Sequence, residues 1–282
     1  MGQHWFPACL ALGLLCGLPG GARAEQFERV TLSAVSRSAP GQSSAGDEAL
    51  LGYLMRPQMV GGGRRPAVIA LHGCGGLFTS DGTRMSSRHK AWAELLAARG
   101  FAVLFPDSFG SRGHAALCKV RPRPVKQADR LRDVETARRW LAAQPFVDTT
   151  RLFVLGWSNG GATALRLARS KKGDGYRHII AFYPGCRVLE ASRRASATPL
   201  TIIMGAADDW TPAEPCKRLA SSWGARLVLY DGAYHGFDAP NSRVRQRRGL
   251  AFTPDGSGVA HVGTHPQARA SAIAEVLSIV KQ

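Results

Sequence analysis

The sequence around Ser158 carries the pattern Gly-x-Ser-x-Gly, which is typical of a serine nucleophile. Residues 156–160 read Gly-Trp-Ser-Asn-Gly, and the apolar run 152–155 before them predicts a strand. The small and apolar residues 161–165 continue into a predicted helix over 159–170. A serine on such a sharp strand-to-helix turn exposes its hydroxyl, and the flanking glycines avoid collisions there. We therefore predict Ser158 as the nucleophile.

A serine hydroxyl needs a general base, and His235 is the best placed of the eight histidines for that role. It lies in a glycine-containing turn directly after the apolar run 227–230. The orienting acid is expected between nucleophile and base along the chain. Asp208 and Asp209 both follow the predicted strand 200–204. We predict Asp208 as the acid, because a Gly-x-x-Asp turn returns it towards the histidine, and Asp209 as a residue that helps to cap the next helix.

Residues 72–76, His-Gly-Cys-Gly-Gly, follow the predicted strand 66–71 and indicate a loop of backbone amides near the nucleophile. We predict the N–H groups of Cys74 and Asn159 as the donors that face a developing oxyanion. A metal site at His72 and Cys74 is disfavoured, because no second pair of residues at ligand spacing accompanies them. We therefore expect neither a metal nor a cofactor.

The elements that must position these residues alternate between strands and helices. The predicted strands are 27–35, 50–55, 66–71, 101–105, 152–156, 179–183, 200–204 and 226–230, and the predicted helices are 87–99, 126–144, 159–170, one that begins near Pro212, and 267–280. Such alternation predicts an α/β fold with a mainly parallel sheet covered by helices on both faces. Active sites of these sheets lie at the carboxyl ends of the strands.

The first 24 residues have the features of a secretory signal peptide. An apolar run over 6–18 is followed by Pro-Gly-Gly and by Ala-Arg-Ala at 22–24, a typical cleavage motif. The alternative is a short N-terminal anchor, but the run is shorter than the ~20 residues that a spanning helix needs. We expect a signal peptide over 1–24, a hydrolase domain over 25–282 without a transmembrane segment, and export to the periplasm or secretion.

The formal net charge of +17 would attract polyanions or an acidic membrane surface. The basic residues are scattered, however, and no nucleic-acid-binding motif accompanies them. We expect no nucleic acid partner and at most a weak attraction to acidic envelope surfaces.

Cleavage of the signal peptide after residue 24 leaves four cysteines. An even number in an oxidising compartment suggests two disulfides, for which three pairings are possible.

From about Ala49 to the C-terminus the chain resembles the dienelactone hydrolase family of α/β-hydrolases. The motifs that carry the resemblance are 71–73, 105–107, 156–161, 205–208 with Pro212, and 233–237. The resemblance places the family's nucleophile, acid and base on Ser158, Asp208 and His235. The founding enzymes use a cysteine nucleophile and carry a glutamate beside the oxyanion strand, where this chain has a serine and a His-Gly pair. In this respect the chain is more similar to general esterases.

The resemblance also implies a pairing of the cysteines. In this architecture the strands that end at Leu71 and Phe105 are neighbours, as are those that end at Tyr183 and Met204. The implied disulfides are Cys74–Cys118 and Cys186–Cys216, both at the rim of the active site.

These features together predict an exported serine hydrolase that cleaves small carboxylic esters through an acyl-serine intermediate. One alternative is amide or peptide cleavage with the same triad. Another is a non-catalytic basic module that keeps a hydrolase fold. The segment 236–265, with its basic cluster at 243–248, is either a lid or a surface loop.

Overall fold

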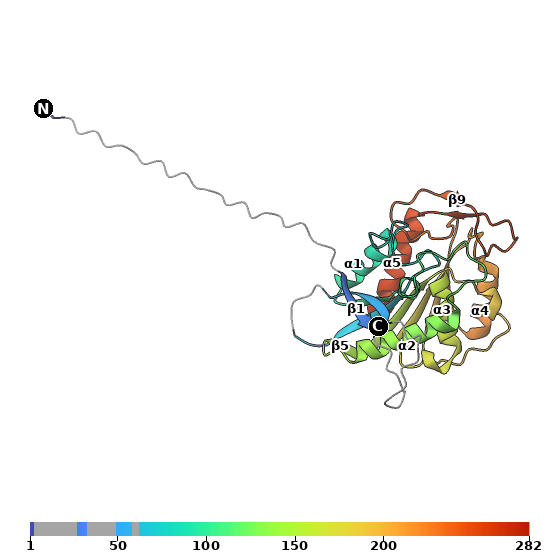
Figure 1. Ribbon diagram of the computed structural model, residues 1–282, viewed down its shortest axis with the longest axis horizontal. Helices are drawn as coiled ribbons and strands as arrows, with labels where there is room; N and C mark the ends of the chain where they lie inside the picture. Colours follow the sequence, from blue (N-terminus) through green and yellow to red (C-terminus); the bar gives the residue numbers. More distant parts are fainter. Residues whose placement is uncertain (3–26, 33–48, 58–61, 282) are drawn as a thin grey trace.

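The computed structural model describes residues 1–2, 27–32, 49–57 and 62–281. The predicted signal peptide lies outside these residues apart from its first two, as does the end of the first predicted strand at 33–35. Eight strands form one sheet in the order β1-β2-β4-β3-β5-β6-β7-β8 (Figure 1). The strands are β1 (Phe27–Leu32), β2 (Leu50–Met55), β3 (Arg65–Leu71), β4 (Ala102–Pro106), β5 (Val147–Trp157), β6 (His178–Phe182), β7 (Leu200–Gly205) and β8 (Arg226–Tyr230).

The sheet is mainly parallel, and its central strands are buried. β3 pairs in parallel with both β4 and β5, and β6, β7 and β8 continue in parallel from β5. β1 and β2 extend the sheet in antiparallel fashion beyond β4. Buried strands of this kind read as continuous apolar runs, which is how the sequence predicts them. Because β3 lies between β4 and β5, the chain reverses direction across the sheet there, and a crevice opens beyond the ends of β3 and β5.

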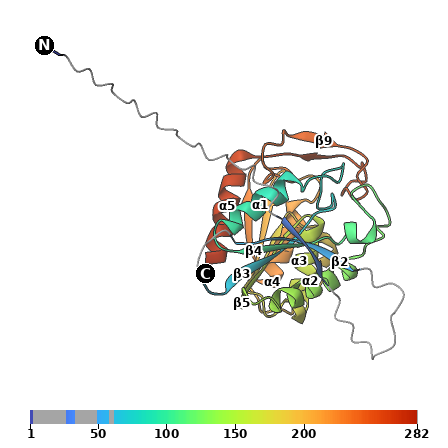
Figure 2. The same cartoon turned by 60° about the vertical axis from the view of Figure 1, so that its left-hand side comes forward.

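Helices cover both faces, as the fold class requires. α1 (Ser87–Ala97) and α5 (Pro266–Lys281) lie on one face, and α2 (Gln127–Ala142), α3 (Asn159–Arg169) and α4 (Ala213–Trp223) lie on the other (Figures 1 and 2). Short 3-10 helices span Gly110–Arg112, Lys171–Gly173 and Arg187–Leu189. The predicted α/β class and its layers are confirmed. No helix in the described ranges has the length and apolarity needed to cross a membrane.

The segment 236–265 contains a hairpin that the sequence reading missed. β9 (Arg245–Arg247) pairs antiparallel with β10 (Ala260–Val262) and crosses the top of the molecule in Figure 1. Val262 also forms a bridge with His235. The hairpin is therefore attached to the edge of the sheet where the strands end.

Two disulfides tie loops at the same edge of the sheet. Cys74, after β3, is bonded to Cys118, after β4. Cys186, after β6, is bonded to Cys216 in α4. These are the pairs that the family resemblance implied.

Candidate active site

Ser158 lies on a strained turn between β5 and α3. Its backbone angles are φ +52° and ψ −112°, a conformation that residues other than glycine rarely adopt. The turn is tight: a Cβ atom on Gly156 would lie 2.4 Å from the carbonyl oxygen of Gly160, and one on Gly160 would lie 2.0 Å from that of Leu71. The glycines at both positions are therefore required by close backbone approach. The turn leaves the Ser158 side chain half-buried at the end of the sheet.

The structure brings Ser158, His235 and Asp208 into one chain of hydrogen-bonded contacts. The Nε2 atom of His235 lies 3.0 Å from the Oγ atom of Ser158. The Nδ1 atom of His235 lies 2.8 Å from the Oδ2 atom of Asp208. Both the histidine and the aspartate are buried. This is the arrangement in which an imidazole can accept a serine proton while a carboxylate fixes its tautomer.

Asp208 is itself held by the turn that follows it. Its Oδ1 atom accepts hydrogen bonds from the backbone N–H groups of Trp210 at 2.9 Å and Thr211 at 2.8 Å. The hydroxyl oxygen of Thr211 lies 3.0 Å from Oδ2 of Asp208 and 3.1 Å from Nδ1 of His235. One carboxylate oxygen is thus used for anchoring, and the other faces the imidazole.

The prediction that Asp209 caps the next helix is wrong. Pro212 is the N-cap residue of α4, and no side chain caps it. Asp209 instead accepts hydrogen bonds from the backbone N–H of His261 at 2.9 Å and pairs with its Nδ1 atom at 2.7 Å. His261 belongs to β10, so Asp209 fastens the β9–β10 hairpin to the active-site edge.

The loop after β3 packs directly against the Ser158 turn. A Cβ atom on Gly73 would lie 3.4 Å from the carbonyl oxygen of Trp157 and 3.5 Å from the Cβ atom of Ser158. Cys74 and Asn159 both line the cavity that contains Ser158. The two predicted oxyanion donors therefore lie beside the nucleophile, and their role in binding an oxyanion stays a prediction.

Arg130 is a site residue that the sequence reading missed. It lies in α2, and its side chain is fully buried. Its Nη2 atom donates to the carbonyl oxygen of His72 at 2.8 Å, and its Nη1 atom donates to Oδ1 of Asn159 at 2.5 Å. Burial lowers the pKa of Arg130 to about 10, so the guanidinium remains charged at neutral pH. Arg130 shares a buried helix face with the apolar Val134 and Ala137. A charged residue on an otherwise apolar helix face is the sequence signal that could have indicated its role.

Two cavities meet at the nucleophile. The Ser158 cavity has a volume of about 390 Å³, and its lining includes Ser158, Cys74 and Trp210. Arginines, apolar side chains and prolines form much of the remaining wall, and no aspartate or glutamate is among its described lining residues. The His235 cavity, of about 180 Å³, also contains Ser158, Cys74 and Trp210 and lies beneath the β9–β10 hairpin. Ser158 is therefore reachable from both sides.

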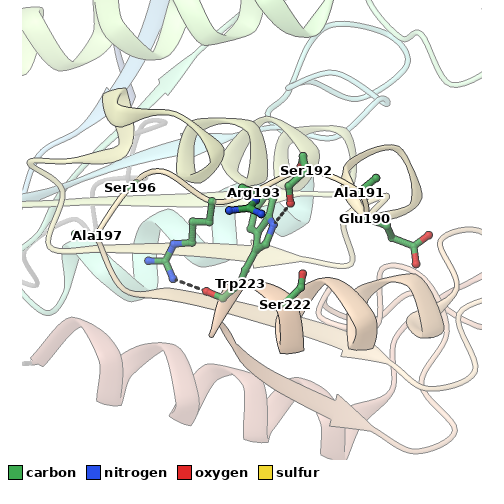
Figure 3. Close-up of a pocket in the computed structure, with 9 residues that line it drawn as sticks. Glu190, Ala191, Ser192, Arg193, Ser196, Ala197, Ser222 and Trp223 are labelled. Carbon is green, nitrogen blue, oxygen red and sulfur yellow. Dashed lines mark hydrogen bonds between the residues drawn. The ribbon is translucent and has the colours of Figure 1, made fainter.

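A third cavity, of about 630 Å³, lies apart from this site between residues 190–197 and the end of α4 (Figure 3). Trp223 lines it and donates from Nε1 to the carbonyl oxygen of Ser192 at 2.7 Å. It shares no lining residue with the two cavities at Ser158.

Within the described residues, no group of three or more histidine, cysteine, aspartate or glutamate side chains could hold a metal ion.

The sequence model of the dienelactone hydrolase family matches residues 50–282. The chain belongs to the dienelactone hydrolase family. The family is one of α/β-hydrolases, and the sheet and helices described above agree with that fold. The chain is therefore a member of a family of hydrolases.

The curated relatives that the chain matches differ in size. A "Probable 2-oxo-3-(5-oxofuran-2-ylidene)propanoate lactonase" of Bradyrhizobium sp. is 28% identical over 210 residues, which cover 67% of this chain and 79% of that protein. A "Probable dipeptidyl-aminopeptidase B" of Emericella nidulans is 28% identical over 121 residues, or 42% of this chain. The chain spans only 13% of the length of that aminopeptidase.

Among solved structures, a dienelactone hydrolase-like promiscuous phosphotriesterase from metagenomic libraries has the same fold. Its TM-score is 0.62 at 19% sequence identity, and the match covers 91% of this chain and 98% of that one. At this identity the likeness concerns the fold alone.

Proposed function

We propose that the protein is an exported serine hydrolase that cleaves carboxylic esters through an acyl-Ser158 intermediate. The observation that carries the proposal is the chain of contacts from Asp208 through His235 to Ser158, with distances of 2.8 Å and 3.0 Å. A base and its orienting acid at hydrogen-bond distance are what a serine hydroxyl needs to become a nucleophile.

The residues divide the reaction between them. Nε2 of His235 accepts the Ser158 hydroxyl proton while Oγ attacks the ester carbonyl carbon. The N–H groups of Cys74 and Asn159 donate to the negative oxygen of the tetrahedral intermediate. The imidazolium then gives its proton to the departing alkoxide, which leaves as an alcohol. A water molecule attacks the acyl carbon in the second half, gives a proton to His235, and the carboxylic acid leaves as Ser158 regains its hydrogen.

The lining of the Ser158 cavity favours an ester or lactone with an apolar body and an acidic group. Val188, Trp210 and Phe252 supply apolar wall, and Arg123 and Arg187 lie among them. Arg123 donates from Nε to the carbonyl oxygen of Leu117 and lies over the Phe252 ring, and no carboxylate in the described lining neutralises either cation, so an acidic group of the substrate can supply the anion. The Bradyrhizobium relative is named for hydrolysis of a lactone that is also a propanoate, which agrees with this substrate class.

Export is supported by the disulfides and by the first 24 residues. Disulfides persist in oxidising compartments such as the periplasm and the extracellular space. The chain has two, Cys74–Cys118 and Cys186–Cys216. We also propose a weak attraction of the protein to acidic envelope surfaces, because its formal net charge is +17.

The test uses short p-nitrophenyl esters and a fluorophosphonate probe. We expect the purified protein to hydrolyse the esters and to form a covalent adduct at Ser158. Ser158→Ala should lower kcat by about a thousandfold or more and abolish the adduct. Ser170→Ala, at the other end of α3, is the matched control and should keep full activity.

Retention of activity by Ser158→Ala would reject the mechanism. A wild-type protein without an adduct would favour the non-catalytic binding module. A panel of peptides at the same enzyme concentration separates ester from amide cleavage, and faster hydrolysis of the peptides would reject the ester assignment.

A further inference from the structure

Asp238 is a buried carboxylate that accepts three hydrogen bonds and forms an ion pair with an arginine. Its Oδ2 atom accepts hydrogen bonds from Nε1 of Trp92 at 2.8 Å and Nε1 of Trp157 at 2.9 Å. Its Oδ1 atom accepts from the hydroxyl of Tyr183 at 2.5 Å and is paired with Nε of Arg88 at 3.2 Å. An ionised carboxylate offers about four lone-pair sites. Three of these sites are therefore used by hydrogen bonds, and the arginine balances the charge of the carboxylate.

The four partners of Asp238 come from elements that are distant along the chain. Arg88 and Trp92 lie in α1, Trp157 is the last residue of β5, and Tyr183 follows β6. The hydrogen bonds to Asp238 span 146, 81 and 55 residues from Trp92, Trp157 and Tyr183 respectively. Asp238 itself lies three residues after His235. One side chain thus joins the histidine loop to a helix and to the ends of two strands.

The link to Trp157 reaches the nucleophile directly, because Trp157 precedes Ser158. Its indole is fully buried and lies parallel to the ring of Phe105, with 6.4 Å between centroids and 9° between planes. The indole N–H has Asp238 as its acceptor. The direction in which the chain enters the strained Ser158 turn is therefore set in part by Asp238.

The link to Tyr183 reaches the base. The ring centroids of Tyr183 and His235 are 4.5 Å apart. Tyr183 has φ +33°, which is rare for a residue with a side chain and requires support from its surroundings. Burial raises the pKa of Tyr183 well above its usual range, so its hydroxyl remains a donor to Asp238. The carboxylate thereby holds the ring against which the imidazole packs.

Arg88 supplies the balancing charge and comes close to the histidine loop. A Cβ atom on Gly236 would lie 2.6 Å from Nη2 of Arg88, and Gly236 has φ +76°. Only glycine meets both conditions without strain. The guanidinium can therefore lie against the residue that follows His235 while it pairs with Asp238.

We propose that Asp238 is a positioning residue that holds the Ser158 turn and the His235 loop at the separation that proton transfer needs. The proposal rests on the proposed function, since Asp238 acts through those two residues. In Asp238→Asn, the amide N–H₂ group must face two donors, either the indoles or the tyrosine and arginine. Some of the four contacts are then lost, and the 3.0 Å approach of His235 to Ser158 loosens.

The test compares Asp238→Asn with Asp133→Asn. Asp133 is also buried and is held by two hydrogen bonds from Arg112, at 2.9 Å and 2.8 Å, away from the histidine loop. We would measure kcat and KM for p-nitrophenyl butyrate, the rate of fluorophosphonate labelling, and the near-ultraviolet circular dichroism of the tryptophans. Rates are expressed per titrated active site, so unfolded protein does not contribute.

Small displacements of reacting groups can lower rates by up to about 100-fold. We expect Asp238→Asn to lower kcat and the labelling rate by about 10- to 100-fold, to leave KM within about twofold, and to change the tryptophan dichroism. Asp133→Asn should keep kcat within about twofold. Equal rates per active site in the two variants would overturn the positioning role while leaving the proposed function intact, whereas a wild type without labelling would overturn both.

If Asp238→Asn does not fold, Tyr183→Phe takes its place as the test variant, because it removes only one hydrogen-bond donor to Asp238. Its matched control is Tyr176→Phe, since Tyr176 is also buried but lines a different cavity, with Arg138. We expect Tyr183→Phe to lower kcat per active site by about 3- to 10-fold with KM unchanged, a fraction of the full displacement effect. An unchanged kcat in Tyr183→Phe would overturn the proposal.

Discussion

Acidification from pH 7 to pH 5 is expected to weaken the fold through two buried histidines. Burial lowers the pKa of His89 to about 3 and that of His72 well below its usual value. Both imidazoles therefore stay neutral in the folded protein at pH 5. In the unfolded chain they take up protons below about pH 6.5. Because the unfolded state then binds more protons, the free energy of unfolding falls as the pH falls.

The size of this effect follows from the pH interval. For His89 the free energy of unfolding falls by about 1.4 kcal/mol per pH unit below about 6.5, or about 2 kcal/mol by pH 5, and His72 lowers it further in the same direction. For His89 the loss continues until the pH reaches its folded pKa of about 3. A domain is stable by about 5–15 kcal/mol in total, so the loss is a large share of it.

The assay is urea unfolding followed by tryptophan fluorescence at pH 7, 6 and 5. His89→Gln should lose about 2 kcal/mol less than wild type between pH 7 and pH 5, because one of the two histidines is gone. Comparing slopes cancels the carboxylates common to both proteins, such as Asp107, whose pKa is raised by burial and which acts in the opposite direction. Leu95→Ala in the same helix is the control and should shift stability equally at all three pH values. A His89→Gln protein with the wild-type slope would refute the reasoning.

Two further predictions concern the active site. Arg130→Met removes the side chain that donates to both His72 and Asn159. It should lower kcat for p-nitrophenyl esters by about 10- to 100-fold, somewhat less than the loss of an oxyanion donor itself. An unchanged kcat would show that the two loops hold their places without Arg130. Arg123→Met should raise KM for an ester that carries a carboxylate by about 5-fold or more and leave KM for a neutral ester unchanged, because one charge-assisted contact is lost. Arg138→Met, which lines a different cavity, is the control for both substrates.

The strands of the sheet and the turn at Ser158 were accessible from sequence because their signals are local. Apolar runs such as 66–71 and 200–204 predict buried strands, and the structure has β3 and β7 there. The short strands β9 and β10 were missed, since three residues each are too few for a period-two pattern to stand out. Asp209 was assigned to a neighbouring helix because its actual partner, His261, lies 52 residues further along the chain.

Asp238 illustrates the limit of sequence reading in this site. Its setting beside a glycine and a phenylalanine resembles that of many surface turns, and nothing local indicates that two indoles and a phenol point at it. Its importance comes from donors up to 146 residues away, which only the folded sheet brings together. Arg130 is different, since a charge among apolar residues at helical spacing is visible in the sequence once the helix face is drawn.

The turn at Ser158 separates architecture from chemistry. The place of the Oγ atom depends on the backbone of residues 156–160 and on the close approaches at Gly156 and Gly160, which involve no atom of the hydroxyl. A sulfur atom on the same Cβ would occupy nearly the same position. Replacement of the nucleophilic oxygen atom by sulfur is therefore compatible with an unaltered backbone, and hydrolases with oxygen and sulfur nucleophiles can share one fold.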